Sequence, residues 1–231
     1  TMSNHSIIPL RTSLERIGGL AGFYVRRRIL GRDLPFLASF KLTYRCNLRC
    51  VPCPYHRRDD ADRSSIRWEA ATAALDALHR DGCRIVVFEG GEPLLWRDGP
   101  KTFDDLARYA RSRFLCTAAT TNGTLPLDVP VDVLWVSLDG TKAMHDRLRS
   151  GSFDRVWENL LKPPRGKLLV HCTMNRENWR DLGPLLDALK QRPAVRGVTL
   201  QLFYPYGQGE EALALSPSER REAVGLAIRL K

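Results

Sequence analysis

Residues 39–53 read Ser-Phe-Lys-Leu-Thr-Tyr-Arg-Cys-Asn-Leu-Arg-Cys-Val-Pro-Cys, a short strand-like run followed at once by three closely spaced cysteines. Thiolates are soft ligands that favour iron–sulfur clusters, zinc or Cu(I). A structural zinc site normally has four ligands, often as two pairs, whereas this C-x3-C-x2-C spacing supplies three. Three ligands on a four-iron cluster would leave one iron free to bind another molecule. The spacing therefore favours a cluster, and the alternative is a zinc site completed by His56, Cys83, Cys116 or Cys172.

A second motif ends the next strand-like run, Arg84–Phe88, and reads Glu89-Gly90-Gly91-Glu92-Pro93. Paired glycines at the end of a strand allow positive φ and let the backbone approach a ligand closely. The carboxylate of Glu92 is suited to an ammonium group. Alone, this stretch is compatible with an ordinary turn, but beside the cysteine triplet it indicates a ligand site.

Around these two motifs, β-rich runs alternate with stretches of helical spacing. The predicted strands are Ser39–Tyr44, Arg84–Phe88, Leu115–Thr121, Val133–Leu138, Leu168–Met174 and Val198–Phe203. The predicted helices are Trp68–His79, Phe103–Arg111, Phe153–Leu161, Trp179–Leu189 and Pro217–Leu230. This alternation indicates an α/β fold with a parallel sheet, and six units favour an open, partial (β/α)6 barrel over a closed eight-fold one. Ligand sites of such folds lie at the carboxyl ends of the strands, where both motifs fall.

The composition is that of an ordinary globular protein. The chain has 231 residues, of which 43% are hydrophobic and 27% charged, and this balance excludes a disordered or fibrous protein. Its six cysteines are too few for a disulfide-stapled mini-protein. No apolar run is long enough to span a bilayer, and no signal peptide is visible at the N-terminus. We therefore expect a cytoplasmic protein with reduced thiols.

Positive charge is concentrated near the N-terminus. The net charge is +10, and residues 1–60 hold eleven Lys and Arg residues against four acidic ones. We divide the chain into a basic N-terminal segment, 1–37, and a barrel domain, 38–231. Because this charge surrounds the cysteine loop in sequence, it favours an acidic electron donor, such as a flavodoxin or ferredoxin, over nucleic acid. Residues 14–30 mix apolar side chains with arginines, which leaves peripheral membrane contact as an alternative.

The cysteine triplet together with Gly90–Pro93 resembles the cluster motif and the methionine-binding motif of the radical SAM superfamily. Thr121-Asn122-Gly123 and Ser137-Leu138-Asp139-Gly140 extend the similarity, which spans residues 38–205. The core is similar to the branch that often carries a cysteine-rich C-terminal extension, the SPASM type. Residues 205–231 contain no cysteine, so we expect either a minimal enzyme without an auxiliary-cluster domain or a barrel domain that is truncated at its C-terminus.

The resemblance implies cofactors and a reaction. Cys46, Cys50 and Cys53 would hold a [4Fe–4S] cluster whose free iron binds S-adenosylmethionine. Reductive cleavage would give a 5′-deoxyadenosyl radical that abstracts hydrogen from an unidentified substrate, a peptide, a lipid or another small molecule. The protein would then be an oxidoreductase or transferase. The competing hypothesis is a non-catalytic zinc protein with a basic segment that binds nucleic acid or a partner.

The resemblance also implies which residues contact S-adenosylmethionine. The methionine moiety would lie on the Gly90–Pro93 motif, with Glu92 paired to its ammonium group, and Ser137 would lie near the ribose or carboxylate. The other expected contacts are Thr121, Asn122 and, for adenine, Tyr55 or Tyr44, because Pro52 occupies the position where an aromatic residue is common.

Strand alternation extends the prediction to the barrel lumen. If Ser137 faces inward, every second strand residue does so too. In the more polar register the inward residues are Lys41, Thr43, Glu89, Thr117, Thr121, Trp135, His171, Thr173, Asn175, Thr199 and Gln201. Such a lumen suggests a polar substrate, with Lys41 and His171 as candidate catalytic residues for proton transfer or anion binding. The alternative for His171 is a satisfied buried histidine.

Overall fold

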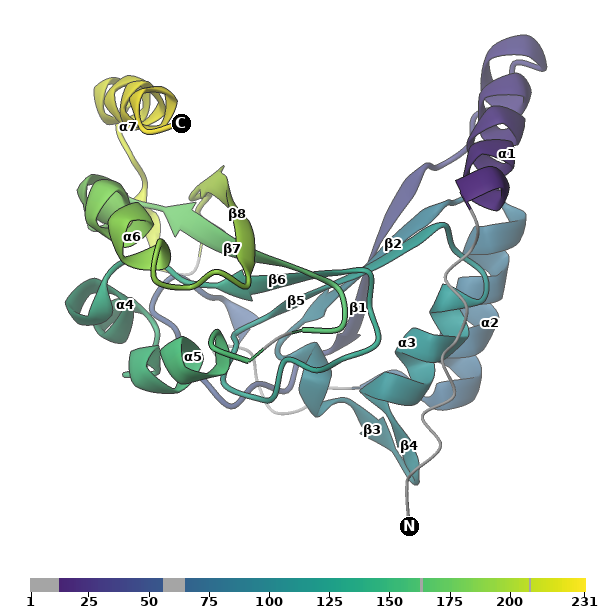
Figure 1. Cartoon of the computed structure of the whole chain (residues 1–231), viewed down its shortest axis with the longest axis horizontal. Helices are drawn as coiled ribbons and strands as arrows, with labels where there is room; N and C mark the ends of the chain where they lie inside the picture. The colour runs from purple at the N-terminus through teal and green to yellow at the C-terminus, as the bar shows by residue number, and fades with distance from the viewer. Residues whose placement is uncertain (1–12, 56–64, 163, 208) are drawn as a thin grey trace.

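The computed structural model describes residues 13–55, 65–162, 164–207 and 209–231. Its main feature is a sheet of six parallel strands in the order β1-β2-β5-β6-β7-β8, with helices on both flanks (Figure 1). The strands are β1 (Leu37–Thr43), β2 (Ile85–Gly90), β5 (Cys116–Thr121), β6 (Val133–Ser137), β7 (Lys167–Met174) and β8 (Val195–Leu202). All five neighbouring pairs are parallel, and this confirms the predicted open barrel. A short antiparallel hairpin, β3 (Arg97–Asp98) and β4 (Lys101–Thr102), follows β2.

Helices follow the strands as the alternation predicts, with two differences. They are α2 (Trp68–Arg80), α3 (Phe103–Arg111), α4 (Lys142–Leu148), α5 (Phe153–Asn159), α6 (Leu182–Leu189) and α7 (Pro217–Arg229). Helix α4 was missed by the sequence prediction. Trp179–Asp181 is a 3-10 turn before α6 rather than part of one long helix. Pro184 has no N–H to donate to the carbonyl of Arg180, so regular α-helix cannot extend back through this point.

Alternation along the strands separates a core face from a cavity face. On β2, Val86 and Phe88 are fully buried under the helices, whereas Val87 and Glu89 line a cavity of about 510 Å³. The cavity opens at the carboxyl ends of the strands, where the loops that follow β1, β2 and β5 meet. The core face is apolar because it packs on helices, and the cavity face is mixed.

The sequence prediction is wrong about which residues of β5 face the cavity. Thr120 pairs with Trp135, and both line the cavity, so Thr117 and Thr121 point to the opposite face. The hydroxyl of Thr117 donates to Asp132 over 3.0 Å, while that of Thr121 bonds the carboxylate of Glu92. A threonine can lie on the core face when a carboxylate accepts its hydroxyl hydrogen, so polarity did not identify the inward face of this strand.

Asn175 is a second correction. It was expected in the lumen, but its side chain is fully buried beyond the end of β7. There its Oδ1 accepts the N–H groups of Glu177 and Asn178 at 2.9 and 3.3 Å. An asparagine that closes a turn in this way satisfies backbone donors instead of facing a ligand.

The described part of the basic N-terminal segment, residues 13–37, lies at the amino ends of the strands, opposite the cavity. Helix α1 (Ser13–Tyr24) continues as a π-helical turn (Val25–Ile29) and packs just before β1, where the rings of Phe23 and Phe36 are 4.9 Å apart (Figure 1). Arg26–Arg28 therefore lie away from the cysteine loop, which follows the carboxyl end of β1. These arginines flank the cysteine loop in the sequence, but the expectation that their charge surrounds the loop in the folded protein is wrong. No helix in the described part of the chain has the length and apolarity needed to cross a membrane.

Candidate functional site

The three cysteines of the first motif share one loop and one cavity. Cys46, Cys50 and Cys53 follow β1 and all line the cavity, with Cys50 buried and the other two half-buried. Burial raises the pKa of the Cys46 and Cys50 thiols. A set of thiols in one loop at the carboxyl end of a parallel sheet fits an iron–sulfur cluster.

Two backbone hydrogen bonds hold this loop against the chain that follows α4. The N–H of Val51 donates to the carbonyl of Leu148 over 2.9 Å, and the N–H of Arg49 donates to the Ser150 hydroxyl over 3.0 Å. Ser150 itself has a positive φ of 57°. The cysteine loop is thus positioned by a segment about one hundred residues away in the sequence.

The other cysteines do not complete a zinc site with this loop. Cys83 and Cys116 lie at the starts of β2 and β5, at the opposite end of the sheet, and Cys172 is buried in β7 between two residues that line the cavity. Over the described ranges, no group of three His, Cys, Asp or Glu side chains could hold one metal ion. His56 lies outside the described residues. The zinc hypothesis therefore has no described fourth ligand.

The glycine pair is required by close backbone contact with the cysteine loop. Gly90 has a φ of 134°, and a Cβ there would lie 2.3 Å from the carbonyl oxygen of Thr43. A Cβ on Gly91 would lie 2.3 Å from the carbonyl oxygen of Arg45. The N–H of Gly91 donates to Thr43 O over 2.7 Å, and that of Glu92 donates to Arg45 O over 2.8 Å. The two sequence motifs therefore form one continuous wall, and Gly90 and Gly91 line the cavity.

Glu92 lies directly behind that wall and is fully buried. Its carboxylate accepts hydrogen bonds from the Thr121 hydroxyl at 2.8 Å and from the N–H groups of Asn122 and Leu94 at 2.7 and 3.1 Å. Burial raises the pKa of Glu92 to about 7, and these hydrogen bonds oppose that shift. Pro93 begins the 3-10 turn Pro93–Leu95 and is buried too. Pairing of Glu92 with a ligand ammonium group remains a prediction, since the carboxylate does not reach the cavity surface.

The remaining predicted cofactor contacts separate into two groups. Ser137, Asn122 and Tyr55 line the cavity, whereas Thr121 does not and instead bonds Glu92. The ring of Tyr55 lies 5.4 Å from that of Tyr44, so both aromatic candidates for adenine are adjacent. Burial raises the pKa of the Tyr55 phenol.

His171 lies on the cavity wall formed by β7. Its Nδ1 is 3.0 Å from the hydroxyl of Thr199, and that hydroxyl also lies 3.2 Å from the carbonyl oxygen of Val170. Because the hydroxyl donates its single hydrogen to the carbonyl, it accepts from Nδ1–H, and Nε2 of the neutral ring is left as an acceptor. Burial lowers the pKa of His171.

Lys41 lies on the opposite edge of the barrel. It is exposed on β1, and its Nζ is 5.7 Å from the centre of the Tyr55 ring. A hydrogen bond with Tyr55 raises the pKa of Lys41. The two candidate catalytic residues are therefore on different walls, and only His171 lines the cavity.

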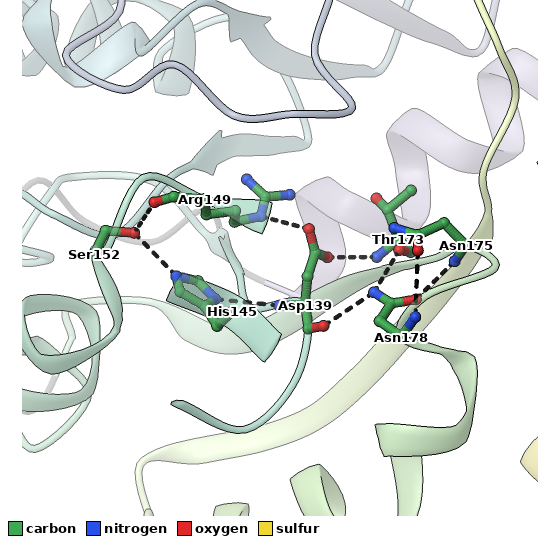
Figure 2. Close-up of polar contacts among 7 residues, drawn as sticks. All are labelled: Asp139, His145, Arg149, Ser152, Thr173, Asn175 and Asn178. Atoms are coloured by element: carbon green, nitrogen blue, oxygen red, sulfur yellow. Dashed lines mark hydrogen bonds and ion pairs between the residues drawn. The ribbon is translucent and has the colours of Figure 1, made fainter. Parts of the chain in front are cut away.

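Arg149 is a site residue that sequence reasoning missed. It lines the cavity with a 13% exposed side chain, and its Nε donates to Oδ2 of the fully buried Asp139 over 2.5 Å (Figure 2). Burial alone would lower the pKa of Arg149, but the charges of Asp139 and Cys50 outweigh it and raise the pKa. The side chain therefore presents a fixed positive charge beside the cysteine loop.

Hydrogen bonds from three elements hold that ion pair in place (Figure 2). The N–H of Thr173 donates to Oδ1 of Asp139 over 2.8 Å, and Nδ2 of Asn178 donates to the Asp139 carbonyl over 2.9 Å. The N–H of Asp139 points at Nδ1 of His145 over 3.3 Å, and Nε2 of His145 lies 3.0 Å from the Ser152 hydroxyl. Asp139 stands in the Ser137–Gly140 stretch that extends the resemblance, but nothing local in the sequence marked Arg149.

An open parallel barrel with a cysteine loop and a glycine pair at the carboxyl end of its first two strands defines a class of iron–sulfur enzymes. The family model for the radical SAM superfamily matches residues 40–189, and the chain belongs to this family. Its cofactors are accordingly a [4Fe–4S] cluster and S-adenosylmethionine, and the thiols of Cys46, Cys50 and Cys53 fit the cluster.

Similar proteins include members that act on different substrates. The chain is 31% identical over 211 residues to the Fe-coproporphyrin III synthase of Methanosarcina barkeri, covering 85% of this chain and 52% of that protein. It is 31% identical over 199 residues to the mycofactocin maturase MftC of Mycolicibacterium smegmatis, covering 78% of this chain and 48% of that protein. The chain thus spans about half the length of these relatives. The crystal structure of Streptococcus suis SuiB bound to S-adenosylmethionine has the same fold, with a TM-score of 0.69, 14% identity and coverage of 93% of this chain and 52% of that one.

Proposed function

We propose that the protein cleaves S-adenosylmethionine reductively and modifies a polar substrate in the cavity. The cofactors, when bound, supply a 5′-deoxyadenosyl radical that abstracts hydrogen from the substrate. The observation that carries the proposal is the continuous wall formed by the cysteine loop and the glycine pair, in which Gly91 and Glu92 donate their N–H groups to carbonyls just before Cys46.

In this proposal, different residues around this wall contact different groups of S-adenosylmethionine. Gly90, Gly91 and Glu92 receive the methionine moiety, with Glu92 as the partner of its ammonium group. Arg149 offers a fixed guanidinium to a carboxylate, and its Nε contact with Asp139 leaves the terminal nitrogens for that purpose. Ser137 supplies a hydrogen bond, Asn122 lines the cavity at the cofactor, and Tyr55 or Tyr44 stacks on adenine.

His171 and Lys41 contact the substrate in this proposal. A neutral imidazole with Nε2 as acceptor takes a hydrogen bond, or a proton, from a substrate hydroxyl or amine. Lys41 keeps its charge and suits an anionic group at the edge of the barrel. The polar neighbours Thr199 and Gln201 on β8 support a polar substrate, which leaves a peptide, a lipid headgroup or another small molecule open.

Anaerobic reconstitution with iron and sulfide tests the function. We expect a brown protein with about four irons that forms 5′-deoxyadenosine from S-adenosylmethionine under a low-potential reductant. The Cys50→Ala variant should assemble no such cluster, whereas Cys172→Ala, which changes a cysteine outside the loop, should retain it. A colourless protein that binds one zinc ion and forms no 5′-deoxyadenosine would refute the proposal.

The electron donor is proposed to be a small acidic protein such as a flavodoxin or ferredoxin. Arg45 and Arg49 support this proposal, because both are exposed and stand beside the cysteines in the loop. Arg28 and Arg32 are also exposed, but they lie at the opposite end of the strands. Replacing Arg45 and Arg49 by Ser should weaken flavodoxin-supported turnover but not dithionite-supported turnover, and raised salt should act in the same direction. The matched change of Arg28 and Arg32 to Ser should leave both rates unchanged. Equal responses of both pairs would contradict this assignment.

A further inference from the structure

A closed ring of three side chains joins the cysteine loop to the end of β5. Nδ2 of Asn122 donates to Oδ1 of Asn47 over 2.8 Å, and Nδ2 of Asn47 donates to the Thr124 hydroxyl over 2.8 Å. The Thr124 hydroxyl in turn donates to Oδ1 of Asn122 over 2.7 Å, which closes the ring. Each member acts once as a donor and once as an acceptor, so the ring has one consistent direction.

The ring leaves one hydrogen of the Asn122 amide unused, and that hydrogen faces a cysteine. Nδ2 of Asn122 lies 3.7 Å from Sγ of Cys46, within hydrogen-bond range for sulfur. Turning the amide over would break its bonds to Asn47 and Thr124 and would place an oxygen against the sulfur. The N–H of Thr124 also donates to Oδ1 of Asn122 over 3.0 Å, which fixes the amide orientation further. Asn122 and Thr124 are buried, so the bonds between them are shielded from bulk water, whereas Asn47 is exposed at the outer edge of the ring.

We propose that the Asn47–Asn122–Thr124 ring is a positioning device that holds an amide N–H on the sulfur of Cys46 and thereby raises the reduction potential of the cluster. This inference rests on the proposed function, since it requires Cys46 to be a cluster ligand. A hydrogen bond to a ligating sulfur stabilises the more negative, reduced cluster. The N–H of Leu48 also points at this sulfur, over 3.5 Å, so Cys46 receives two donors. Asn47 and Thr124 act only through Asn122 and are positioning residues.

The test compares variants that break the ring with one that preserves it. Thr124→Val removes the hydroxyl at constant shape, Asn122→Asp removes the N–H donor, and Thr124→Ser retains the hydroxyl. Thr72→Val is the matched control, because its hydroxyl bonds the carbonyls of Trp68 and Glu69 on α2, away from the cysteines. The midpoint potential of each reconstituted cluster is measured by redox titration followed by electron paramagnetic resonance, together with iron content.

We expect Thr124→Val and Asn122→Asp to bind wild-type amounts of iron at a more negative potential. At a fixed solution potential, the ratio of reduced to oxidised cluster should fall about tenfold, which is about 59 mV for one electron. Thr124→Ser and Thr72→Val should match the wild type. Unchanged potentials in the first two variants, or loss of iron from them, would overturn the role of the ring while leaving the proposed function intact. A wild-type chain that assembles no four-iron cluster would refute the proposed function, and the role of the ring with it.

Discussion

The buried ion pair between Asp139 and Arg149 permits a quantitative prediction. Asp139 is fully buried and Arg149 is 13% exposed, so neither side chain is well solvated. The Asp139→Ala change leaves the guanidinium without its carboxylate and the N–H of Thr173 without its acceptor. Removing one partner of a buried pair costs about 3–5 kcal/mol of unfolding free energy. For a chain of this size each kcal/mol lowers Tm by about 2–4 °C, so we expect a fall of roughly 6–20 °C.

Urea unfolding of the apoprotein measures this cost, with an exposed pair as the control. Arg165 and Asp128 also form an ion pair, but their side chains are 40% and 59% exposed, and Asp128→Ala should cost about 1 kcal/mol or less. The double variant Asp139→Ala/Arg149→Met should recover part of the lost stability, because the cost comes largely from an uncompensated buried charge. The reasoning is refuted if Asp139→Ala is no more harmful than Asp128→Ala, or if the double variant is less stable than the single one.

Three further predictions concern pH, packing and ligand binding. His145→Gln should flatten the pH dependence of apoprotein stability between pH 6.5 and 4, measured by urea unfolding across that range. Burial lowers the pKa of His145 from 6.5 to about 4. The contribution of the neutral ring to the free energy of unfolding is therefore complete above pH 6.5 and is lost as the pH falls from 6.5 to 4. Gly91→Ala should prevent cluster assembly, because the added Cβ would lie 2.3 Å from the carbonyl oxygen of Arg45. Gly18→Ala is the control, because nothing lies within 4 Å of a Cβ at that position, and it should retain the cluster. The iron content of each variant measures the outcome. Glu92→Gln should bind wild-type iron but weaken S-adenosylmethionine binding in anaerobic calorimetry at least about tenfold, or 1.4 kcal/mol.

The sequence was informative where a signal is local in the chain. The cysteine triplet and the glycine pair each lie within a few residues, and backbone geometry requires glycine at positions 90 and 91. The strand predicted over Arg84–Phe88 was found from its apolar run, and the structure places it at Ile85–Gly90, which ends two residues before Glu92. Arg149 could not be found in this way, because its role depends on Asp139 at the end of β6 and on Thr173 in β7, which the fold brings together.

The error in β5 has a different cause. Its residues Cys116–Thr121 are small on both faces, so neither hydrophobicity nor polarity marks an inward side. Neighbouring residues instead determine which face each residue of β5 occupies. Thr120 pairs with Trp135, and the carboxylate of Asp132 accepts a hydrogen bond from the Thr117 hydroxyl. A strand of small residues takes its orientation from the strands beside it, and sequence alternation alone cannot supply that information.

The two buried carboxylates of the site share an origin in the parallel sheet. Strand β7 extends past the end of β6, whose last residue, Ser137, pairs with His171, and the chain leaves the sheet directly after β5 at Thr121. Glu92 accepts the N–H of Asn122 just beyond β5, and Asp139 accepts the N–H of Thr173 near the end of β7. Each carboxylate thus accepts a backbone N–H and also supports residues that line the cavity, since Glu92 lies behind the glycine pair and Asp139 holds Arg149. Because one side chain serves both purposes, loss of turnover in a variant cannot by itself assign a chemical role. A variant distinguishes a role in cofactor binding from a role in supporting the fold only if it keeps the iron content and the free energy of unfolding of the wild type.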